Sequence, residues 1–358
     1  MAFTPARAIL YRQEAARFGV SPPPTLPLPT FSNLPREADT TPAYLAGSQR
    51  VIYAAIAGNA AIAASKFFAA MVTGSAVMLA EGIHSVVDTG NELLLLLGSR
   101  RSLRPADSIH PFGYGKELYF WSLLVAMLVF ALGSGLSIYE GIARLLSHQQ
   151  VLSRPAANYI VLAVAAVFEF LTWMVAQHEL NRFRPRGLSL WATIQRSKDP
   201  SVFSVFLEDT CALAGLAVAA AGIFLSHRFG LRWLDPAASL VVGGLLAGAA
   251  WILARESRAL LVGESATEEQ IRAVRDMIAA EPAVEQVGRL FTMQLGPGAV
   301  LMTANIRFRR ELKMPDLEAA IDRIERQARA IDPTIRHIFL EAESLRATPG
   351  VETPRDRF

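Results

Sequence analysis

Cysteine is almost absent from this chain of 358 residues, which contains a single thiol at Cys211. One cysteine excludes a disulfide framework and any metal site built from several thiolates. Charge is also scarce, since Asp, Glu, Lys and Arg make up 19% of the residues, where an average globular chain has about 25%. The 35 basic residues form no dense stripe, so the sequence does not favour binding to nucleic acid.

Apolar residues are correspondingly abundant, at 52% of the chain with a mean hydropathy of +0.30. They gather into long blocks, which is typical of a membrane protein. Six blocks come close to the length of about 20 residues that a helix needs to cross a bilayer. The second and the fifth contain charged residues, so they are not simple lipid-facing spans. The six blocks are Val51–Val72, Ala76–Leu97, Tyr119–Leu145, Tyr159–Ala176, Val202–Ser226 and Pro236–Leu253.

Positive charge in the loops predicts how these spans are oriented. The loops after the second and fourth spans are rich in Arg and Lys, whereas the loop between the first two spans has neither. Because basic loops stay in the cytoplasm, we expect both termini there, in a protein of the cell (inner) membrane. From residue 263 onward, 14 basic and 16 acidic residues give a net charge of −2, and the chain before it has +5. This division fits a basic membrane part followed by a soluble cytoplasmic domain.

The regions outside the spans divide into two tails and one small domain. Residues 1–47 contain a Pro-rich stretch over 21–42 and are expected to form an unfolded tail, as are residues 347–358. A transmembrane domain over 48–258 is followed by patterns of helix (267–280), strand (284–295, 300–308), helix (315–330) and strand (335–342). The predicted fold class is a six-span α-helical membrane protein with a cytoplasmic αββαβ domain over 259–346, of the α+β, ferredoxin-like kind.

Ionisable side chains in the second block form the first candidate site. His84 and Asp88 are four residues apart and share one helix face. An imidazole nitrogen and a carboxylate oxygen suit a divalent ion such as Zn²⁺, and a buried pair without a partner is costly in a bilayer. The spacing alone fits a structural hydrogen bond between helices equally well. Glu81, one turn earlier, is either an entry or proton-relay group or a partner of a neighbouring helix.

Two adjacent carboxylates in the fifth block, Glu208 and Asp209, form the second candidate site. Asp209 would be a third ligand opposite His84 and Asp88. Glu208 points about 100° away around the helix, so it can join them only with distortion. A place at the membrane edge is the alternative for this pair. Glu169 in the fourth block belongs either to a proton path or to a hydrogen bond between helices.

The loop before the third span reads Asp107-Ser-Ile-His110-Pro-Phe-Gly-Tyr-Gly-Lys-Glu117. Its proline and two glycines predict a tight turn, and its aromatic residues can pack at the membrane surface. Asp107 and His110 could bind a metal ion weakly. A purely structural turn is the favoured interpretation.

Together these features resemble the cation diffusion facilitator family. The resemblance covers residues 48–346. It implies a homodimer in the lipid bilayer that exports Zn²⁺, or else Mn²⁺, Co²⁺, Fe²⁺ or Cd²⁺, from the cytoplasm in exchange for protons, and that is no enzyme. The zinc transporter 9-like branch has a similar Asp-Pro-Ser run, here from Asp199, followed by Phe-Leu-Glu-Asp-Thr. The other matching pieces are the six spans, His84-x-x-x-Asp88, the loop from His110, Asp209, Asp235-Pro and the αββαβ order.

The metal site of that family is incomplete in this chain. The family's fifth helix usually has His at the position of Val205, so Glu208 or water would have to complete a site made by His84, Asp88 and Asp209. An oxygen-rich site makes Mn²⁺ more plausible, although Zn²⁺ stays first. The alternative is a non-transporting scaffold or sensor that lost its complete metal site. An intramembrane metalloenzyme is a weaker alternative, since no nucleophile stands beside the candidate ligands.

Two further departures concern the regions outside the spans. Tyr114 stands where the loop often carries a second His. Phe291, Asn305 and Phe339 stand where the cytoplasmic domain of the family often has zinc-binding histidines, and His337 is the single histidine of that region. We therefore expect this domain to dimerise without a zinc cluster.

Overall fold

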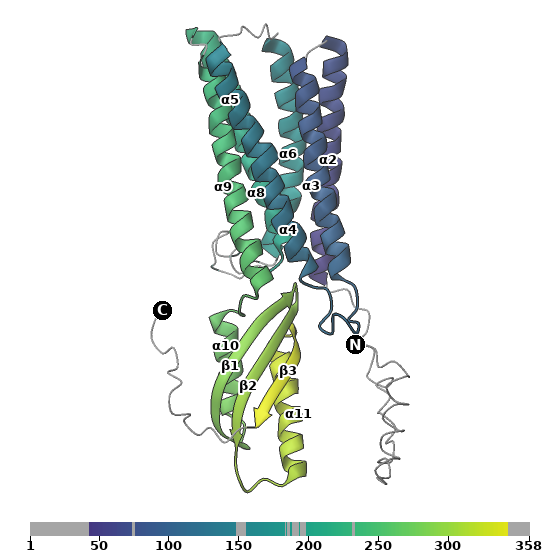
Figure 1. Ribbon diagram of the computed structural model, residues 1–358, viewed down its shortest axis with the longest axis vertical. Coiled ribbons are helices and arrows are strands. Elements are labelled where there is room, and N and C mark those ends of the chain that lie inside the picture. Colours follow the sequence, from purple (N-terminus) through teal and green to yellow (C-terminus); the bar gives the residue numbers. More distant parts are fainter. Residues whose placement is uncertain are drawn as a thin grey trace, which may run out of the picture. The chain divides into compact units, whose positions relative to one another are not determined.

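The computed structural model describes residues 43–73, 76–147, 155–182, 198–230 and 233–342, together with positions 184, 187 and 193. Within this part, a set of long helices precedes a small region of mixed helix and strand (Figure 1). Of the tail predicted over 1–47, residues 1–42 lie outside the described residues, and a helix begins at Ala43. The tail predicted over 347–358 also lies outside them.

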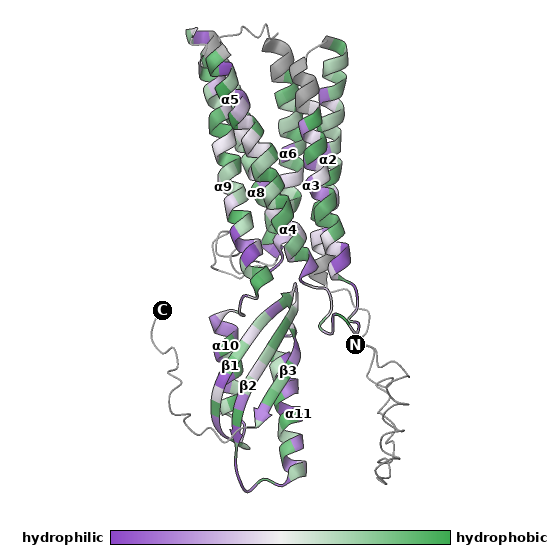
Figure 2. Cartoon of the chain, viewed as in Figure 1, coloured by the Kyte–Doolittle hydropathy of each residue, from purple (hydrophilic) through white to green (hydrophobic). Residues whose placement is uncertain are grey.

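Six helical segments coincide with the six apolar blocks. Five of them are long and apolar enough to cross a membrane, and apolar colouring runs along most of their length (Figure 2). The exception is α3, which contains Asp88 and Glu92 and ends near two arginines. These helices make the chain a multi-pass membrane protein. Their bounds are α2 Ala43–Thr73, α3 Ala76–Ser102, α4 Glu117–Leu128 with the π-helix η2 Val129–Ser134 and α5 Gly135–Ser147, α6 Pro155–Arg182, α8 Pro200–Phe229 and α9 Leu234–Val262.

The start of α8 is fixed by its capping residues. The Asp199 carboxylate accepts a hydrogen bond of 2.9 Å from the backbone N–H of Ser201, and Pro200 occupies a first-turn position that needs no N–H. The hydroxyl of Ser48 in α2 donates a second hydrogen bond to the same carboxylate. The helix ends before Gly230, whose φ of 66° lies in the left-handed region that glycine favours. These contacts fix where α8 begins, and therefore which of its side chains face α2 and α6.

The interior of the bundle is built from apolar side chains of α2, α3, α4, α6, α8 and α9. Leu95, Val125, Phe203 and Leu253 are fully buried there. Between α5 and α9 the backbones approach closely, because a Cβ atom at Gly243 would lie 2.6 Å from Cγ1 of Ile138. Small residues allow such close packing of membrane helices, where no hydrophobic driving force between helices is available.

The C-terminal domain confirms the predicted αββαβ order. Its sheet has the order β1-β2-β3, with β1 antiparallel and β3 parallel to the central strand. Alternate residues of β2, from Val300 to Ile306, are buried against α10 and α11, which cover one face of the sheet (Figure 1). The bounds are α10 Glu268–Ala279, β1 Val284–Gly296, β2 Ala299–Phe308, α11 Met314–Ile331 and β3 Ile335–Ala342.

The opposite face of this sheet carries exposed aromatic side chains. Phe291 of β1 pairs with Thr303 of β2, which in turn pairs with Phe339 of β3. The two phenylalanines therefore share one row across the sheet, and they are 58% and 54% exposed. Exposed apolar rows of this kind mark surfaces that contact another molecule.

One ion pair joins the end of α10 to α11. Arg323 donates to the Glu281 carboxylate at 2.7 Å from Nη2 and 3.4 Å from Nε, and the Glu281 side chain is almost fully buried. This hydrogen bond lowers the pKa of Glu281 below its ordinary value. A buried carboxylate that loses its cation is destabilising, so the pair fixes the packing of the two helices.

We expect Arg323→Gln to weaken the C-terminal domain at neutral pH and to have little effect in acid. A carboxylate whose pKa is lowered by folding contributes stability above its ordinary value of 4.5 and loses that contribution as the pH falls through its folded pKa. Hydrogen-exchange protection of residues 268–342, measured in the full chain at pH 7 and below pH 4 and corrected for intrinsic exchange, tests this. The exposed Arg326→Gln is the control, and an equal loss of protection at both pH values would contradict the prediction.

Candidate metal site in the membrane domain

Three ionisable side chains follow one face of α3 at intervals of four residues. His84 and Asp88 lie with Nε2 and Oδ2 3.9 Å apart, and their side chains are 32% and 27% exposed. This separation is too long for a hydrogen bond between the two groups. Glu92 follows one turn later and is 1% exposed. The backbone of Glu81 belongs to the same helix, but its side chain lies outside the described residues.

The two acidic residues of α8 lie inside the bundle. Asp209 is 3% exposed and its carboxylate contacts the side chain of Thr172 in α6. Glu208 lies beside the side chain of Asn91 in α3. Oδ2 of Asp209 and Oε2 of Glu208 are buried and have no hydrogen-bond partner among the described residues. Asp209 is thus a buried side chain, whereas Glu208 is half-buried with one buried carboxylate oxygen.

Carboxylates from three helices interact electrostatically at this place. Glu169 of α6 lies within range of Asp88 and Asp209, and Lys66 of α2 provides a compensating positive charge for it. The ammonium of Lys66 also donates to the Ser85 hydroxyl on α3 at 2.9 Å. The cluster, which we call the acidic cluster, consists of Asp88, Glu92, Glu169, Glu208 and Asp209.

The structure thus brings several predicted ligands into one region without closing them around an ion. Asp88, Glu208 and Asp209 belong to the acidic cluster, and His84 contacts Asp88. Among the described residues, however, no three His, Cys, Asp or Glu side chains are close enough to hold one metal ion. Val205, where the resemblance leads one to look for an imidazole, is fully buried and contributes only carbon. Binding an ion here therefore requires the helices or side chains to move.

Glu92 and Asn91 are two polar residues of this region that the sequence analysis did not select. Both oxygens of Glu92 are buried and lack a hydrogen-bond partner within the described part of the chain. The signal for Glu92 was present, because it continues the four-residue spacing of His84 and Asp88. Glu92 was missed because it lies directly before a run of five leucines, which made this part of the block look purely apolar. Nothing in the sequence marked the contact between Asn91 and Glu208, which depends on how α3 and α8 are paired.

The loop between α3 and α4 uses its carboxylate as a turn anchor. Asp107 accepts hydrogen bonds from the backbone N–H groups of Ile109 and His110, at 2.9 and 2.6 Å, and from the Tyr114 hydroxyl at 2.7 Å. The Tyr114 hydroxyl, followed by these N–H groups, lowers the pKa of Asp107, and the same bond raises the pKa of Tyr114. His110 Nδ1 is 3.6 Å from Asp107, and its ring stacks on that of Tyr114. These contacts agree with the structural turn, which was the favoured interpretation.

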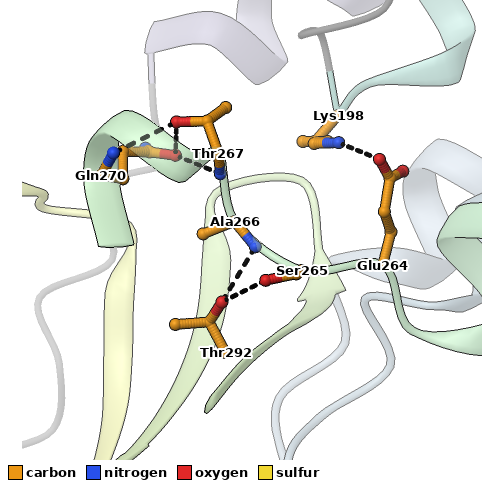
Figure 3. A network of polar contacts seen from close by, with 7 residues as sticks. All are labelled: Lys198, Glu264, Ser265, Ala266, Thr267, Gln270 and Thr292. Carbon is orange, nitrogen blue, oxygen red and sulfur yellow. Dashed lines mark hydrogen bonds and ion pairs between the residues drawn. The ribbon is translucent and has the colours of Figure 1, made fainter. Parts of the chain in front are cut away.

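A polar network lies where the chain leaves α9 (Figure 3). Lys198, just before α8, forms an ion pair of 2.9 Å with Glu264, just after α9. Thr292 of β1 contacts the Ser265 hydroxyl at 2.8 Å and accepts from the N–H of Ala266 at 3.0 Å. Thr267 and Gln270 then form a capping box that starts α10. The connection between the last membrane helix and the C-terminal domain is therefore an ordered one.

Comparison with known proteins establishes the class to which this fold and site belong. The chain matches the family described as the cation efflux transmembrane domain over residues 52–262, which is more than half of its length. The chain belongs to this cation efflux family. The family comprises metal transporters and not enzymes.

Particular relatives are similar over most of the chain. It is 31% identical to the proton-coupled zinc antiporter SLC30A9, mitochondrial, of Homo sapiens, over 87% of this chain and 61% of the relative. It is 28% identical to metal tolerance protein C4 of Arabidopsis thaliana, over 83% and 74%. It is also 28% identical to the cation-efflux pump FieF of Escherichia coli, over 68% and 79%. The chain thus spans about three fifths of the length of the antiporter relative.

We expect Glu92→Leu to raise the melting temperature of the metal-free chain. A buried polar group without a hydrogen bond destabilises a fold by about 1–3 kcal/mol, and leucine of similar size removes it. Glu92→Gln keeps a polar group of the same shape and should give a smaller increase. Melting of the detergent-solubilised chain, followed by intrinsic fluorescence, measures the series. A melting temperature of the leucine variant below that of the unchanged protein would show that Glu92 stabilises the bundle.

Proposed function

We propose that this chain moves a divalent metal cation across a membrane, with the acidic cluster and His84 as the place where the ion is held in transit. The observation that supports this most is the gathering of five carboxylates from α3, α6 and α8 among apolar helices, where Glu92 and Asp209 are buried and the other three are half-buried. Buried carboxylates without partners are costly in a bilayer, which makes them rare outside ion and proton pathways. His84, Asp88 and Asp209 would bind the ion, and Glu208 would take the place of the imidazole missing at Val205.

Zn²⁺ is the first candidate for the ion, since imidazole and carboxylate are among its usual ligands. The donor set has one imidazole and several carboxylates, which also suits Mn²⁺, Co²⁺, Fe²⁺ or Cd²⁺. The name of the human relative includes zinc, and that supports Zn²⁺ here. In this proposal the metal ion is the transported substrate and not a resident cofactor.

Exchange against protons has a physical basis in the same ligands. Imidazole and carboxylate ligands lose their metal when they bind protons, so protons from the far side can displace the ion. Glu169, which interacts with Asp88 and Asp209, is the described side chain best placed to carry protons to or from them. Glu81 is proposed for the same path on its sequence position alone.

We further propose that α3 also crosses the membrane, which makes six spans in all, and that both termini face the cytoplasm. α3 is less apolar than the other five helices because it contains Asp88 and Glu92. Both residues belong to the acidic cluster, which we propose as the ion site. The loops rich in Arg and Lys support this orientation. The bilayer would be the cell membrane, although the name of the human relative places that protein in mitochondria.

We propose that the main role of Asp107 and His110 is to stabilise the turn in the α3–α4 loop. Any metal bound there would have to displace the Tyr114 hydroxyl and two backbone N–H groups from the Asp107 carboxylate. This pair is therefore at most an accessory site.

The alternative function, a scaffold or sensor without transport, is favoured by two observations. The imidazole at position 205 is missing, and no three-ligand cluster is closed within the described residues. A measurement of metal flux separates the two functions.

We expect Asp88→Ala and Asp209→Ala each to reduce metal-dependent flux into proteoliposomes by about tenfold or more, since each removes a direct ligand. Uptake of Zn²⁺ and Mn²⁺ with an imposed pH gradient is the measurement. The control is Glu140→Gln, which removes a carboxylate of α5 that pairs with Arg144 outside the acidic cluster. Unchanged uptake in both alanine variants would refute the proposed site, and absence of flux in the unchanged protein would favour the scaffold.

We also propose that the chain forms a homodimer through the open sheet face of the C-terminal domain, which carries Phe291 and Phe339. Phe291→Ser should raise the dimer dissociation constant by about tenfold, because buried aromatic side chains dominate interface energies. Light scattering of the solubilised full chain across a dilution series tests this. Met314→Ser, which removes an exposed apolar side chain at the start of α11, is the control. Equal dissociation constants for the two variants would place the interface elsewhere.

A further inference from the structure

A cavity of about 670 Å³ lies at the end of the third membrane segment. Its walls come from the end of α3, the α3–α4 loop, the start of α4 and two apolar side chains of β1, Met293 and Leu295. The start of α4 also begins the apolar span Glu117–Leu146. The cavity therefore lies at the level where a membrane span meets lipid headgroups, and its volume is within the range of about 300–1,000 Å³ that ligand pockets have.

Two cations, Arg101 and Lys116, line this cavity. Neither Arg101 nor Lys116 forms an ion pair with any residue that the structure describes. Nε of Arg101 is buried and lacks a hydrogen-bond partner among the described residues, and its guanidinium lies 5.5 Å from the centre of the Trp121 ring. The one acidic side chain in the lining, Glu117, accepts a hydrogen bond of 2.8 Å from the Trp121 indole. The lining therefore has an excess of positive charge and an unused donor.

Apolar side chains at the rim complement these charges. Phe120 of α4 and Phe112 of the loop both line the cavity, and they are 50% and 44% exposed. The Phe112 ring also lies edge-on to the rings of His337 and Phe339 in β3. Tryptophan is enriched at membrane–water interfaces, where one side of its ring is apolar and its N–H is hydrated or hydrogen-bonded. Positive charge beside exposed aromatic rings at this depth matches an amphipathic anion better than a small hydrophilic one.

We propose that this cavity binds the headgroup of an anionic phospholipid of the surrounding bilayer. The phosphate would accept hydrogen bonds from Arg101 and Lys116, and the rings of Phe120 and Phe112 would lie against the glycerol and the first acyl carbons. A charge-assisted hydrogen bond to phosphate is stronger than a neutral one, and the planar guanidinium can donate two at once. This site lies outside the acidic cluster and does not depend on the identity of the transported ion.

The chain offers a matched control in the residue next to Arg101. Arg100 carries the same charge at the same end of α3, but its Nη2 donates to the Tyr53 hydroxyl of α2 at 2.8 Å, and it does not line the cavity. Loss of general positive charge at the membrane surface would affect both variants alike. Loss of this site would affect only one of them.

Native mass spectrometry of the detergent-solubilised full chain, titrated with dioleoyl phosphatidylglycerol or dioleoyl phosphatidylcholine, tests the proposal. We expect the unchanged protein and Arg100→Gln to retain phosphatidylglycerol in preference to phosphatidylcholine. Arg101→Gln and Lys116→Gln should each weaken phosphatidylglycerol binding by about tenfold. Equal retention of the two lipids, or an equal loss in the Arg100 and Arg101 variants, would overturn the proposal.

Two further measurements keep the test decisive if the Arg101 variant is unstable. Phosphatidylglycerol with brominated acyl chains should quench the fluorescence of the unchanged protein more than that of Trp121→Phe, and equal quenching would contradict the site. Glycerol 3-phosphate and inorganic phosphate should raise the melting temperature far less than phosphatidylglycerol does. An equal increase would show that the cavity takes a free anion and would likewise overturn the lipid assignment.

Discussion

The organising constraint of this protein is the burial of carboxylates among apolar helices. A bilayer offers no water to solvate them, so each such group needs a hydrogen bond, a proton or a cation. Asn91 and Thr172 contact Glu208 and Asp209, but other carboxylate oxygens of the acidic cluster lack partners among the described residues. An arrangement of this kind gives up stability in the empty state and gains affinity for positive charge. Affinity for positive charge is the property that a member of the cation efflux family needs.

The same constraint explains why the site is distributed over several helices. Ligands on one helix can be four residues apart, as His84 and Asp88 are, but they cannot surround an ion. Asp209 on α8 and Glu169 on α6 bring oxygen atoms from other directions. When the ligands are shared between helices, the site can open and close as the helices separate and approach. A transporter that exposes its site to each side of the membrane in turn requires such motion. The open state of the site in this conformation is consistent with such a cycle.

Outside the membrane helices, positions where the family often has metal ligands carry other side chains. The loop turn is held by the hydrogen bond that the Tyr114 hydroxyl donates to the Asp107 carboxylate. In the C-terminal domain, Phe291 and Phe339 form part of an exposed apolar row instead of a histidine cluster.

The sequence by itself determined the order of the elements and named most residues of the proposed site. Apolar blocks and period-two strands depend on local pattern, so six helical segments and the αββαβ order could be read directly, as could His84, Asp88, Glu208 and Asp209. The tertiary structure alone decided which helices face each other. That pairing placed Asn91 beside Glu208 and buried Glu92. It also brought Arg100 to the Tyr53 hydroxyl, whereas Nε of Arg101, one residue away, has no hydrogen-bond partner within the described part of the chain. Contacts between residues far apart in the chain depend on helix packing, which no local pattern encodes.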